Sequence, residues 1–255
     1  IFLSNFMTCN IALNGFFGRM GQSIFEESKK NSNCIITVGC DIKEKLLNNT
    51  FENITLTSDI EKHSENFDVV IDFTLPEPSI DLIKKCVRIN KPITIGTTGF
   101  SQEQLSLIFE ASKEIPILLA PNMSHGVNVS FAALEDISKS LKNYDVSIIE
   151  THHENKIDSP SGTAIKMAEI ICQSKNVQLG DVNSKDCPIK FTSHRENTEI
   201  GTHHVIFKSK SDEICLTHIA NDRSIFALGA LDTAAWVSKQ KPGLYNYQHY
   251  ISSKS

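Results

Sequence analysis

The stretch NIALNGFFGRMGQSIFEESKKN, residues 10–31, indicates the fold of the first part of the chain. It begins with a short apolar run typical of a buried strand, and it ends with residues at helical spacing. Between them stand Gly15, Gly18 and Gly21, which allow a tight turn and a close approach of the backbone to a phosphate. The stretch therefore predicts a strand, a glycine turn and a helix that together begin a dinucleotide-binding unit.

The same alternation of strands and helices continues to about residue 122. Apolar, β-branched runs at 34–41, 68–74, 91–99 and 115–122 alternate with helical patterns at 78–90 and 102–114, and Ser101 should cap the second of these helices. Strands joined through helices pair in parallel, because each crossover returns the chain in the same direction. We therefore expect an α/β fold with a Rossmann-like, doubly wound parallel sheet.

A different rhythm follows between residues 123 and 222. Helical patterns at 127–143 and 161–176 accompany strand-like runs at 144–153, 187–197, 199–210 and 212–222. Short polar turns separate the last three runs, which indicates an antiparallel sheet in an α+β domain. An amphipathic helix is expected at 223–240. We predict a dinucleotide-binding domain of residues 1–122 and 223–255, with an inserted substrate-binding and tetramerisation domain of residues 123–222.

Further residues support a dinucleotide ligand for the glycine turn. Its spacing, G-x-x-G-x-x-G, differs from the commoner G-x-G-x-x-G, so on this motif alone a turn without any ligand stays an alternative. Arg19 adds a cation at the helix start, and Asp41 ends the second strand, where an acid accepts hydrogen bonds from ribose hydroxyls. The loops at 73–74 and 96–99 follow two further strands at the same sheet edge. Together these features favour a nicotinamide dinucleotide cofactor.

The stretch THHENKIDSPSGTA, residues 151–164, carries the most specific chemical signal. His152, His153 and Lys156 offer groups that donate protons near neutral pH, as a reductase needs beside the carbon that receives hydride. Residues 161–163 begin a helix, and free amides and hydroxyls there can hold a carboxylate. Cations beside such a helix start imply a small anionic substrate.

A metal site is the alternative use of the paired histidines. No third ligand at convincing spacing is visible near His152 and His153. His203 and His204 are expected in the middle of a strand, where neighbouring side chains point to opposite faces and cannot chelate together. We therefore predict no metal.

Composition argues against several classes of protein. The net charge of −5 does not suit a nucleic-acid or anionic-membrane surface, and no apolar run is long enough to span a bilayer. Seven scattered cysteines indicate reduced thiols in a cytoplasmic protein. The opening IFLSNFM, residues 1–7, is short and lacks basic residues, so we expect it to run directly into a strand and not to be a signal peptide.

Six motifs carry a resemblance to a known family, and in order along the chain they are GFFGRMG, VVIDFTLPE, IGTTGF, APNMSHGVN, IIETHHENKIDSPSGTA and KPGLY. They span nearly the whole length, and the chain with them resembles the 4-hydroxy-tetrahydrodipicolinate reductase (dihydrodipicolinate reductase) family of the lysine and diaminopimelate pathway. The block HHENKIDSPSGTA is very specific to that family. The resemblance implies NADH- or NADPH-dependent reduction of a small dicarboxylate, and a homotetramer built by the antiparallel sheets.

The resemblance also implies roles for individual residues. His152 would be the catalytic histidine and Lys156 the proton donor. The residues expected to contact substrate are His153, Ser161, Gly162, Thr163 and Arg223. Together with the loop at 73–74, the residues expected to bind the cofactor are Gly15, Phe16, Phe17, Gly18, Arg19, Met20, Asp41, Phe73, Thr74, Gly96, Thr97, Thr98, Ala120, Pro121, Asn122 and Met123.

Two positions depart from the family pattern. Met123 stands where many members have Phe, and Ile42 stands where members that bind NADP well often carry Arg. Asp41 accepts ribose hydroxyls but repels a 2′-phosphate. We therefore expect NADH to be used at least as well as NADPH, unless Lys43 or Arg19 supplies the missing cation.

Two other functions compete with this interpretation. A dinucleotide-sensing regulator without chemistry would explain residues 1–122 but would leave the stretch 151–164 without a use. A semialdehyde dehydrogenase would need an activated cysteine in a Gly/Asn-rich turn at a helix start, and none of the seven cysteines has that setting. Oxidation of NAD(P)H in the presence of the upstream synthase discriminates between these functions and the reductase.

Overall fold

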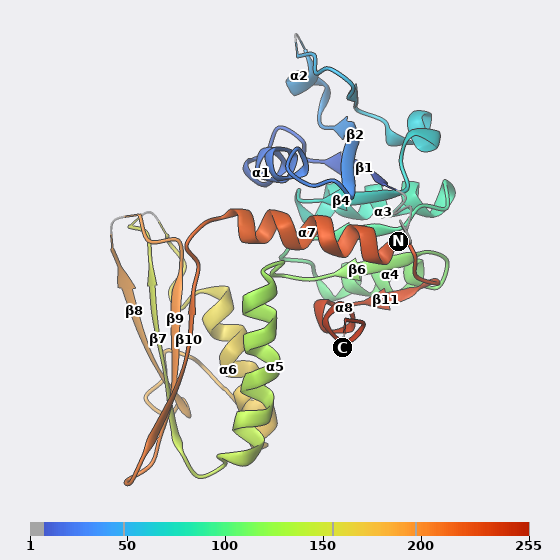
Figure 1. Cartoon of the computed structure of the whole chain (residues 1–255). Coiled ribbons are helices and arrows are strands. Elements are labelled where there is room, and N and C mark those ends of the chain that lie inside the picture. Colours follow the sequence, from blue (N-terminus) through green and yellow to red (C-terminus); the bar gives the residue numbers. More distant parts are fainter. Residues whose placement is uncertain (1–7, 48, 155, 197, 255) are drawn as a thin grey trace, which may run out of the picture. The chain divides into compact units, whose positions relative to one another are not determined.

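The structure is a computed structural model that describes residues 8–47, 49–154, 156–196 and 198–254 (Figure 1). It divides into two compact units. The first comprises the described residues up to Ser124 and those from Ser224 onward, and the second is His125–Arg223. The opening segment 1–7, for which the sequence predicts entry into a strand and no signal peptide, lies outside the described residues.

The first unit is built on a seven-stranded parallel sheet. Its strands are β1 (Cys9–Asn14), β2 (Cys34–Cys40), β3 (Thr55–Thr57), β4 (Val69–Asp72), β5 (Ile93–Ile95), β6 (Pro116–Leu119) and β11 (Gly243–Tyr245). The order is β11-β6-β5-β4-β1-β2-β3, and every neighbouring pair is parallel. The chain therefore runs outward in both directions from the middle of the sheet, which confirms the doubly wound α/β prediction.

Helices cover both faces of this sheet. Neighbouring residues of a strand point to opposite faces, and here both sets of side chains are apolar and need to be buried. Ile11 and Leu13 of β1 lie in one core cluster and Ala12 lies in the other. The helices that contribute to the first cluster are α1 (Arg19–Ser28), α7 (Ser224–Val237) and α8 (Tyr247–Ser252). The second cluster takes in α3 (Pro76–Arg88), α4 (Gln102–Ser112) and the 3₁₀ helix η1 (Ile60–Asn66).

Local sequence signals set where several helices begin and end. The predicted cap of α4 is confirmed, because the Ser101 hydroxyl accepts from the Gln104 amide and the Gln104 side chain accepts from the Ser101 amide. Pro76 stands in the first turn of α3, where its missing amide hydrogen costs nothing. In the second unit, Asn176 ends α6 (Gly162–Lys175) with a left-handed backbone (φ 58°).

The second unit packs two helices against a four-stranded sheet. Its remaining elements are α5 (His125–Ser140), β7 (Asp145–His152), β8 (Ile189–Arg195), β9 (Thr202–Lys208) and β10 (Glu213–Ile219). The order is β10-β9-β7-β8, with β7 antiparallel to β9 but parallel to β8. The predicted antiparallel sheet is confirmed for β10, β9 and β7, whereas β8 pairs with β7 in parallel. The reason is that α6 connects β7 to β8 and returns the chain in the original direction.

Several short elements were not predicted. These are α2 (Lys43–Leu46), β3, η1, β11 and α8. The strands expected at 68–74 and 91–99 end at Asp72 and Ile95, so residues 73–74 and 96–99 form loops at the carboxyl edge of the sheet. In the part of the chain that the structure describes, no helix is long and apolar enough to cross a membrane.

Candidate active site

The glycine turn after β1 depends on the absence of side chains at specific points. Gly15 has a left-handed backbone (φ 80°), and a Cβ there would lie 2.7 Å from the Phe73 carbonyl oxygen. A Cβ on Gly21 would lie 2.2 Å from the Gly15 carbonyl oxygen, so only glycine lets α1 pack this closely on the turn. Gly18 is the N-cap of α1 and its amide donates to the Gly15 carbonyl. The result is a tight turn with an exposed backbone at the start of α1.

Asp41 lies against this turn. Its Oδ2 accepts from the Phe17 amide at 2.9 Å, and its Oδ1 accepts from the Ile42 amide at 2.9 Å. The Lys45 ammonium is 3.3 Å from the same Oδ1, because Lys45 follows Asp41 by four residues and α2 turns it back. Sequence reasoning named Lys43 and Arg19 as candidate cations here, and the structure instead brings Lys45 to the carboxylate.

A pocket of about 630 Å³ lies in front of Asp41 and the glycine turn. Among the described residues that line it are two cations, Lys45 and Lys85, whereas Lys43 and Arg19 do not line it. The predicted cofactor residues in its wall are Gly15, Gly18, Asp41, Phe73 and Thr74. The side chain of Phe16, in contrast, is fully buried in the first core cluster, so Phe16 can offer only its backbone to a ligand.

Asp72 holds the two carboxyl-edge loops together, and sequence reasoning missed it. This fully buried carboxylate accepts from Thr74 Oγ1 and Thr97 Oγ1, each at 2.8 Å, and from Ser79 Oγ. Thr97 Oγ1 in turn accepts from the Thr74 amide at 2.9 Å. The sequence signal that could have found it is an Asp at the end of a buried strand, followed by Phe and Thr. A buried carboxylate needs several hydrogen-bond donors, so such an Asp predicts donors in the neighbouring loops.

A second pocket of about 340 Å³ is lined by most of the residues that were predicted to contact the nicotinamide. Its lining residues are Met20, Phe73, Gly96, Thr98, Pro121, Asn122, Met123 and Phe226. Gly96 needs to be glycine, because a Cβ there would lie 2.2 Å from the Phe73 ring. Phe226 was not predicted, since it comes from α7, more than a hundred residues along the chain from the others. Ala120 is buried and does not line this pocket.

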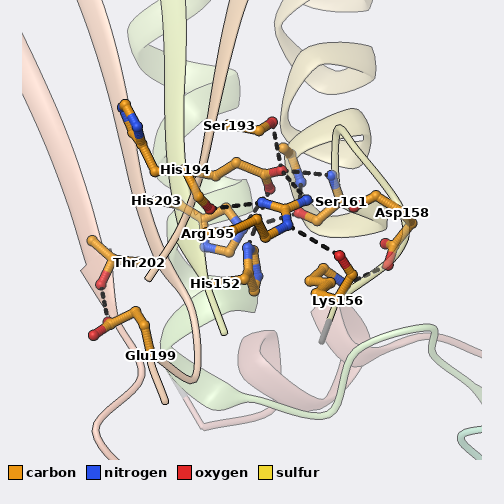
Figure 2. Close-up of polar contacts among 12 residues, drawn as sticks. His152, Lys156, Asp158, Ser161, Ser193, His194, Arg195, Glu199, Thr202 and His203 are labelled. Atoms are coloured by element: carbon orange, nitrogen blue, oxygen red, sulfur yellow. Dashed lines mark hydrogen bonds and ion pairs between the residues drawn. The ribbon is translucent and has the colours of Figure 1, made fainter. Parts of the chain in front are cut away.

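In the second unit, the stretch 151–164 gathers around the end of β7. Figure 2 shows His152, Arg195 and His203 beside Ser161, with Lys156 and Asp158 on the adjacent loop. The Lys156 ammonium is 2.8 Å from Asp158 Oδ1. Arg195 fixes this loop, because its guanidinium donates to the carbonyls of Lys156 (3.2 Å) and Asp158 (2.6 Å).

Glu150 lies at the centre of the contacts beneath this loop. Its Oε1 accepts from the Ser161 amide at 2.9 Å and from Ser193 Oγ at 2.8 Å. Its Oε2 is 3.6 Å from His152 Nδ1 and 3.7 Å from His203 Nε2. Only 1% of Glu150 is exposed.

The charges of this cluster follow from burial and from its neighbours. Burial and, to a smaller extent, the nearby His152 lower the pKa of His203 to about 4, so His203 is neutral at pH 7. Burial also lowers the pKa of His152, although Glu150 acts in the opposite sense. For Glu150, burial raises the pKa, but the hydrogen bonds from Ser161 and Ser193 outweigh it and the carboxyl stays ionised.

The other residues predicted to contact the substrate lie before or at the start of α6 and directly before α7. Ser161 is the N-cap of α6, and its hydroxyl accepts from the Ala164 amide at 3.2 Å. Gly162 begins α6, and no atom lies within 4 Å of where its Cβ would be, so the helix start is open. The carbonyl of His153 accepts from the Lys156 amide, and Arg223 is exposed directly before α7.

Strand register explains why sequence reasoning missed Glu150, Arg195 and His203. Glu150 faces Ser193 on β8 and His203 on β9, and His152 faces Arg195. Glu150 and His152 also share one face of β7 by their spacing of two. The spacing of Glu150 and His152 was visible in the sequence, whereas the register of the three strands was not.

Three side chains of the cluster around Glu150 lie close enough together to surround a metal ion. One ligand atom each from Glu150, His152 and His203 lies within 4.8 Å of the others. One histidine of each sequence pair therefore meets Glu150, a carboxylate that the sequence prediction did not include. The absence of a metal stays a prediction.

Comparisons with known proteins give matches over both units. Residues 9–123 match a family model described as dihydrodipicolinate reductase, N-terminus, and residues 126–251 match the C-terminus of the same family. A 4-hydroxy-tetrahydrodipicolinate reductase from Buchnera aphidicola subsp. Cinara cedri is 41% identical, over 92% of this chain and 94% of the relative. The Pelagibacter ubique protein of the same description is 39% identical, over 95% and 98%. A dipicolinate-bound dihydrodipicolinate reductase from Paenisporosarcina sp. TG-14 superposes with a TM-score of 0.79 and 25% identity, over 94% and 98%.

Proposed function

The chain belongs to the dihydrodipicolinate reductase family, and from this membership we propose that it catalyses the NAD(P)H-dependent reduction of 4-hydroxy-tetrahydrodipicolinate to tetrahydrodipicolinate in lysine and diaminopimelate biosynthesis. The observation that carries the proposal is the match of both units, residues 9–123 and 126–251, to the two halves of one family. Reductase relatives cover nearly the whole chain, so neither half is left without a role.

The residues of the first unit fit a nicotinamide dinucleotide. The turn at Gly15, Gly18 and Gly21 has no room for a Cβ at two of its three glycines, and it leaves amides at the start of α1 for a pyrophosphate. Asp41 lies beside that turn at the end of β2, where it can accept hydrogen bonds from ribose hydroxyls. When bound, the reduced nicotinamide supplies the hydride for C4 of the substrate ring.

Lys156 and His152 would handle the proton in this reaction. The 4-hydroxyl leaves as water together with a hydrogen of the adjacent carbon, which forms a double bond, and a hydride then adds to C4 while a proton adds to that adjacent carbon. Lys156 is the proposed donor of that proton, and it forms an ion pair with Asp158 at 2.8 Å. His152 would shape the charge beside the reacting carbons.

The start of α6 would hold a carboxylate of the substrate. A helix start attracts anions, and there is open space beside Gly162. Ser161 keeps this start in place through the amide that donates to Glu150. The dipicolinate bound to the relative from Paenisporosarcina is a ring with two carboxylates, which supports this class of ligand for the present chain.

Turnover coupled to the upstream synthase tests the proposal. The wild-type protein should oxidise NADH or NADPH only when the synthase supplies its product. Lys156→Ala should lower kcat about 100-fold or more and leave the cofactor KM nearly unchanged, because the lost interaction is made in the transition state. Thr163→Val should mainly raise the KM of the dicarboxylate.

A matched control is available on α6. Lys166 is ion-paired with Glu169 at 3.0 Å on the surface, so Lys166→Ala removes the same charge from the same unit without touching the loop. Its kcat should stay within about twofold of wild type. Near-normal turnover by Lys156→Ala would contradict the assignment of the proton donor.

The alternative of a dehydrogenase with a thiolate nucleophile is not favoured. Burial raises the pKa of Cys9 to about 11 and the pKa of Cys34 and of Cys40 to about 12. A nucleophilic cysteine needs a lowered pKa. Of the other cysteines, Cys86 and Cys172 are also buried. The half-buried Cys187 precedes strand β8 and the exposed Cys215 lies within strand β10, so neither is at a helix start.

We also propose that the protein is a cytoplasmic homotetramer assembled through its four-stranded sheets. All seven cysteines are free, as expected for a reducing compartment. Ile214 and Ile219 on β10 are large apolar residues that are about half exposed, and a sheet-to-sheet contact between copies would cover them. A monomeric mass by light scattering would refute this assembly.

A further inference from the structure

Glu150 connects four segments of the second unit. From its place on β7 it contacts Ser161 at the start of α6, Ser193 on β8 and His203 on β9. Neither the family match nor the sequence motif assigns it a role. Because these contacts all use one carboxylate, Glu150 sets where the start of α6 lies relative to β7.

Two buried atoms in this cluster face each other without partners. Glu150 Oε2 and His152 Nδ1 are 3.6 Å apart, and neither has a hydrogen-bond partner among the described residues. That distance is slightly longer than a formed hydrogen bond. Leaving both atoms unpaired costs free energy, and catalytic hydrogen bonds are often long before substrate binds and shorten in the complex.

His152 is better suited than His203 to donate to this oxygen. His203 Nε2 lies 3.7 Å from Glu150 Oε2 but already has Ser161 Oγ at 3.2 Å. His152 Nδ1 has no such alternative, and Glu150 is ionised because its hydrogen bonds outweigh its burial. The other charged groups that act on His152 are Lys156, Asp158 and Arg195.

The orientation of the His152 ring places its two nitrogens in different settings. Nδ1 faces the buried carboxylate, whereas Nε2 faces Gly201, where a Cβ would lie only 3.1 Å away. The absence of a side chain at Gly201 therefore leaves room at Nε2.

We propose that Glu150 is a positioning residue for the reduction: its Oε2 takes the Nδ1–H of His152, which leaves Nε2 as the nitrogen without a proton, while its Oε1 fixes the start of α6. One carboxylate then sets both the tautomer of the histidine and the place of the start of α6. This inference rests on the proposed function in that it gives His152 a part in the chemistry. The tautomer itself is defined without substrate.

The first test is the tautomer of His152 in the wild-type holoenzyme. Protein labelled with ¹⁵N at histidine gives long-range ¹⁵N–¹H NMR spectra that separate a protonated ring nitrogen from a bare one. Loss of signals in His152→Gln assigns the resonance. We expect a protonated Nδ1 and a bare Nε2, which is the opposite of the preference of free histidine in water.

The second test is Glu150→Gln, which keeps the shape and an oxygen that can accept from Ser161 and Ser193. Its amide nitrogen would donate to His152 Nδ1 and so move the ring proton to Nε2. We expect the tautomer to reverse and kcat to fall about 100-fold, while the NADH KM changes less than about threefold. Glu150→Asp keeps the charge and should restore the wild-type tautomer with part of the kcat.

Ser193→Ala is the matched control, because it removes one hydrogen bond to Oε1 and leaves Oε2 untouched. It should keep the tautomer and lower kcat by less than about threefold. A variant with native circular dichroism and native NADH binding qualifies for comparison. If Glu150→Gln fails to fold, the wild-type spectrum alone still decides the inference.

Three results would overturn the inference. A bare Nδ1 in the wild type would show that Glu150 does not receive the proton. A Glu150→Gln variant with an unchanged tautomer and near-normal kcat would show that the carboxylate is not needed. A stoichiometric metal in the purified protein, with His152 signals that shift when a chelator removes it, would show that an ion and not a proton joins the two residues. A protonated Nδ1 in a protein without reductase turnover would instead refute the proposed function and leave the tautomer assignment standing.

Discussion

Lys45→Ala is expected to lower the ratio of kcat/KM for NADPH to kcat/KM for NADH about fivefold. The Lys45 ammonium lies 3.3 Å from Asp41 Oδ1 and lines the pocket in front of the glycine turn. An adenosine 2′-phosphate placed beside Asp41 would meet the same ammonium, which can leave the carboxylate for it. NADH carries no such phosphate, so it gains nothing from Lys45 beyond the neutralisation of Asp41.

The size of the effect follows from Coulomb's law and exposure. Two unit charges about 4 Å apart interact by about 1 kcal/mol in water and by about 4 kcal/mol at an effective dielectric constant near 20. The Lys45 side chain is 46% exposed, so solvent screening places the value near the lower figure. About 1 kcal/mol corresponds to roughly a fivefold change in the ratio of kcat/KM values.

Steady-state assays with both cofactors at one ionic strength measure this ratio. Lys43→Ala is the control, because Lys43 is in the same short helix and carries the same charge but does not line the pocket. Its ratio should change less than about twofold. An unchanged ratio in Lys45→Ala, or an equal change in Lys43→Ala, would refute the reasoning. The wild type should still use NADH at least as well as NADPH, and Ile42→Arg should shift the ratio toward NADPH.

Two further outcomes follow from the geometry. Gly21→Ala should weaken NADH binding at least about tenfold in a fluorescence titration, because its Cβ would lie 2.2 Å from the Gly15 carbonyl oxygen and force the turn apart; unchanged affinity would mean that the turn does not hold the cofactor. The free energy of unfolding should fall as the pH drops from about 6.5 to about 4, because the unfolded chain protonates His203 in that interval while the folded chain keeps it neutral. His203→Gln should make this slope, measured by urea titrations, shallower, and an unchanged slope would assign the effect to other groups.

The alternation of strands and helices in the first unit could be predicted because each of these elements has a local sequence signal. The apolar run of β1, the glycines after it and the Ser101 cap each act within a few residues. Strand direction is not local in this sense. The alternating sequence of β8 resembles those of β9 and β10, which pair antiparallel with each other, and only the crossover through α6 makes β8 parallel to β7. The three residues of β11 are too few to show a pattern, and they form a strand because β6 offers an edge.

The residues of the candidate site also fall into two groups, those that the sequence predicted and those that it did not. The stretch 151–164 was recognisable because its chemistry lies within one continuous segment. Glu150, Arg195 and His203 come together through the register of three strands, which no short window contains. Lys45 was missed in favour of Lys43 because α2, a helix of four residues, decides which lysine turns back to Asp41.

The late return of the chain to its first sheet has a consequence for synthesis on the ribosome. Strand β11 and helix α7 complete the edge and one face of a sheet whose other six strands precede residue 120. Until α7 has emerged, β4, β5 and β6 lack the helix that packs against them, which carries the buried residues Ala227, Ala230 and Leu231. The second unit is one continuous segment and can finish folding earlier. A nascent chain halted before Ser224 should therefore present an open apolar face to chaperones, and this exposure should end only when residues 224–245 have been made.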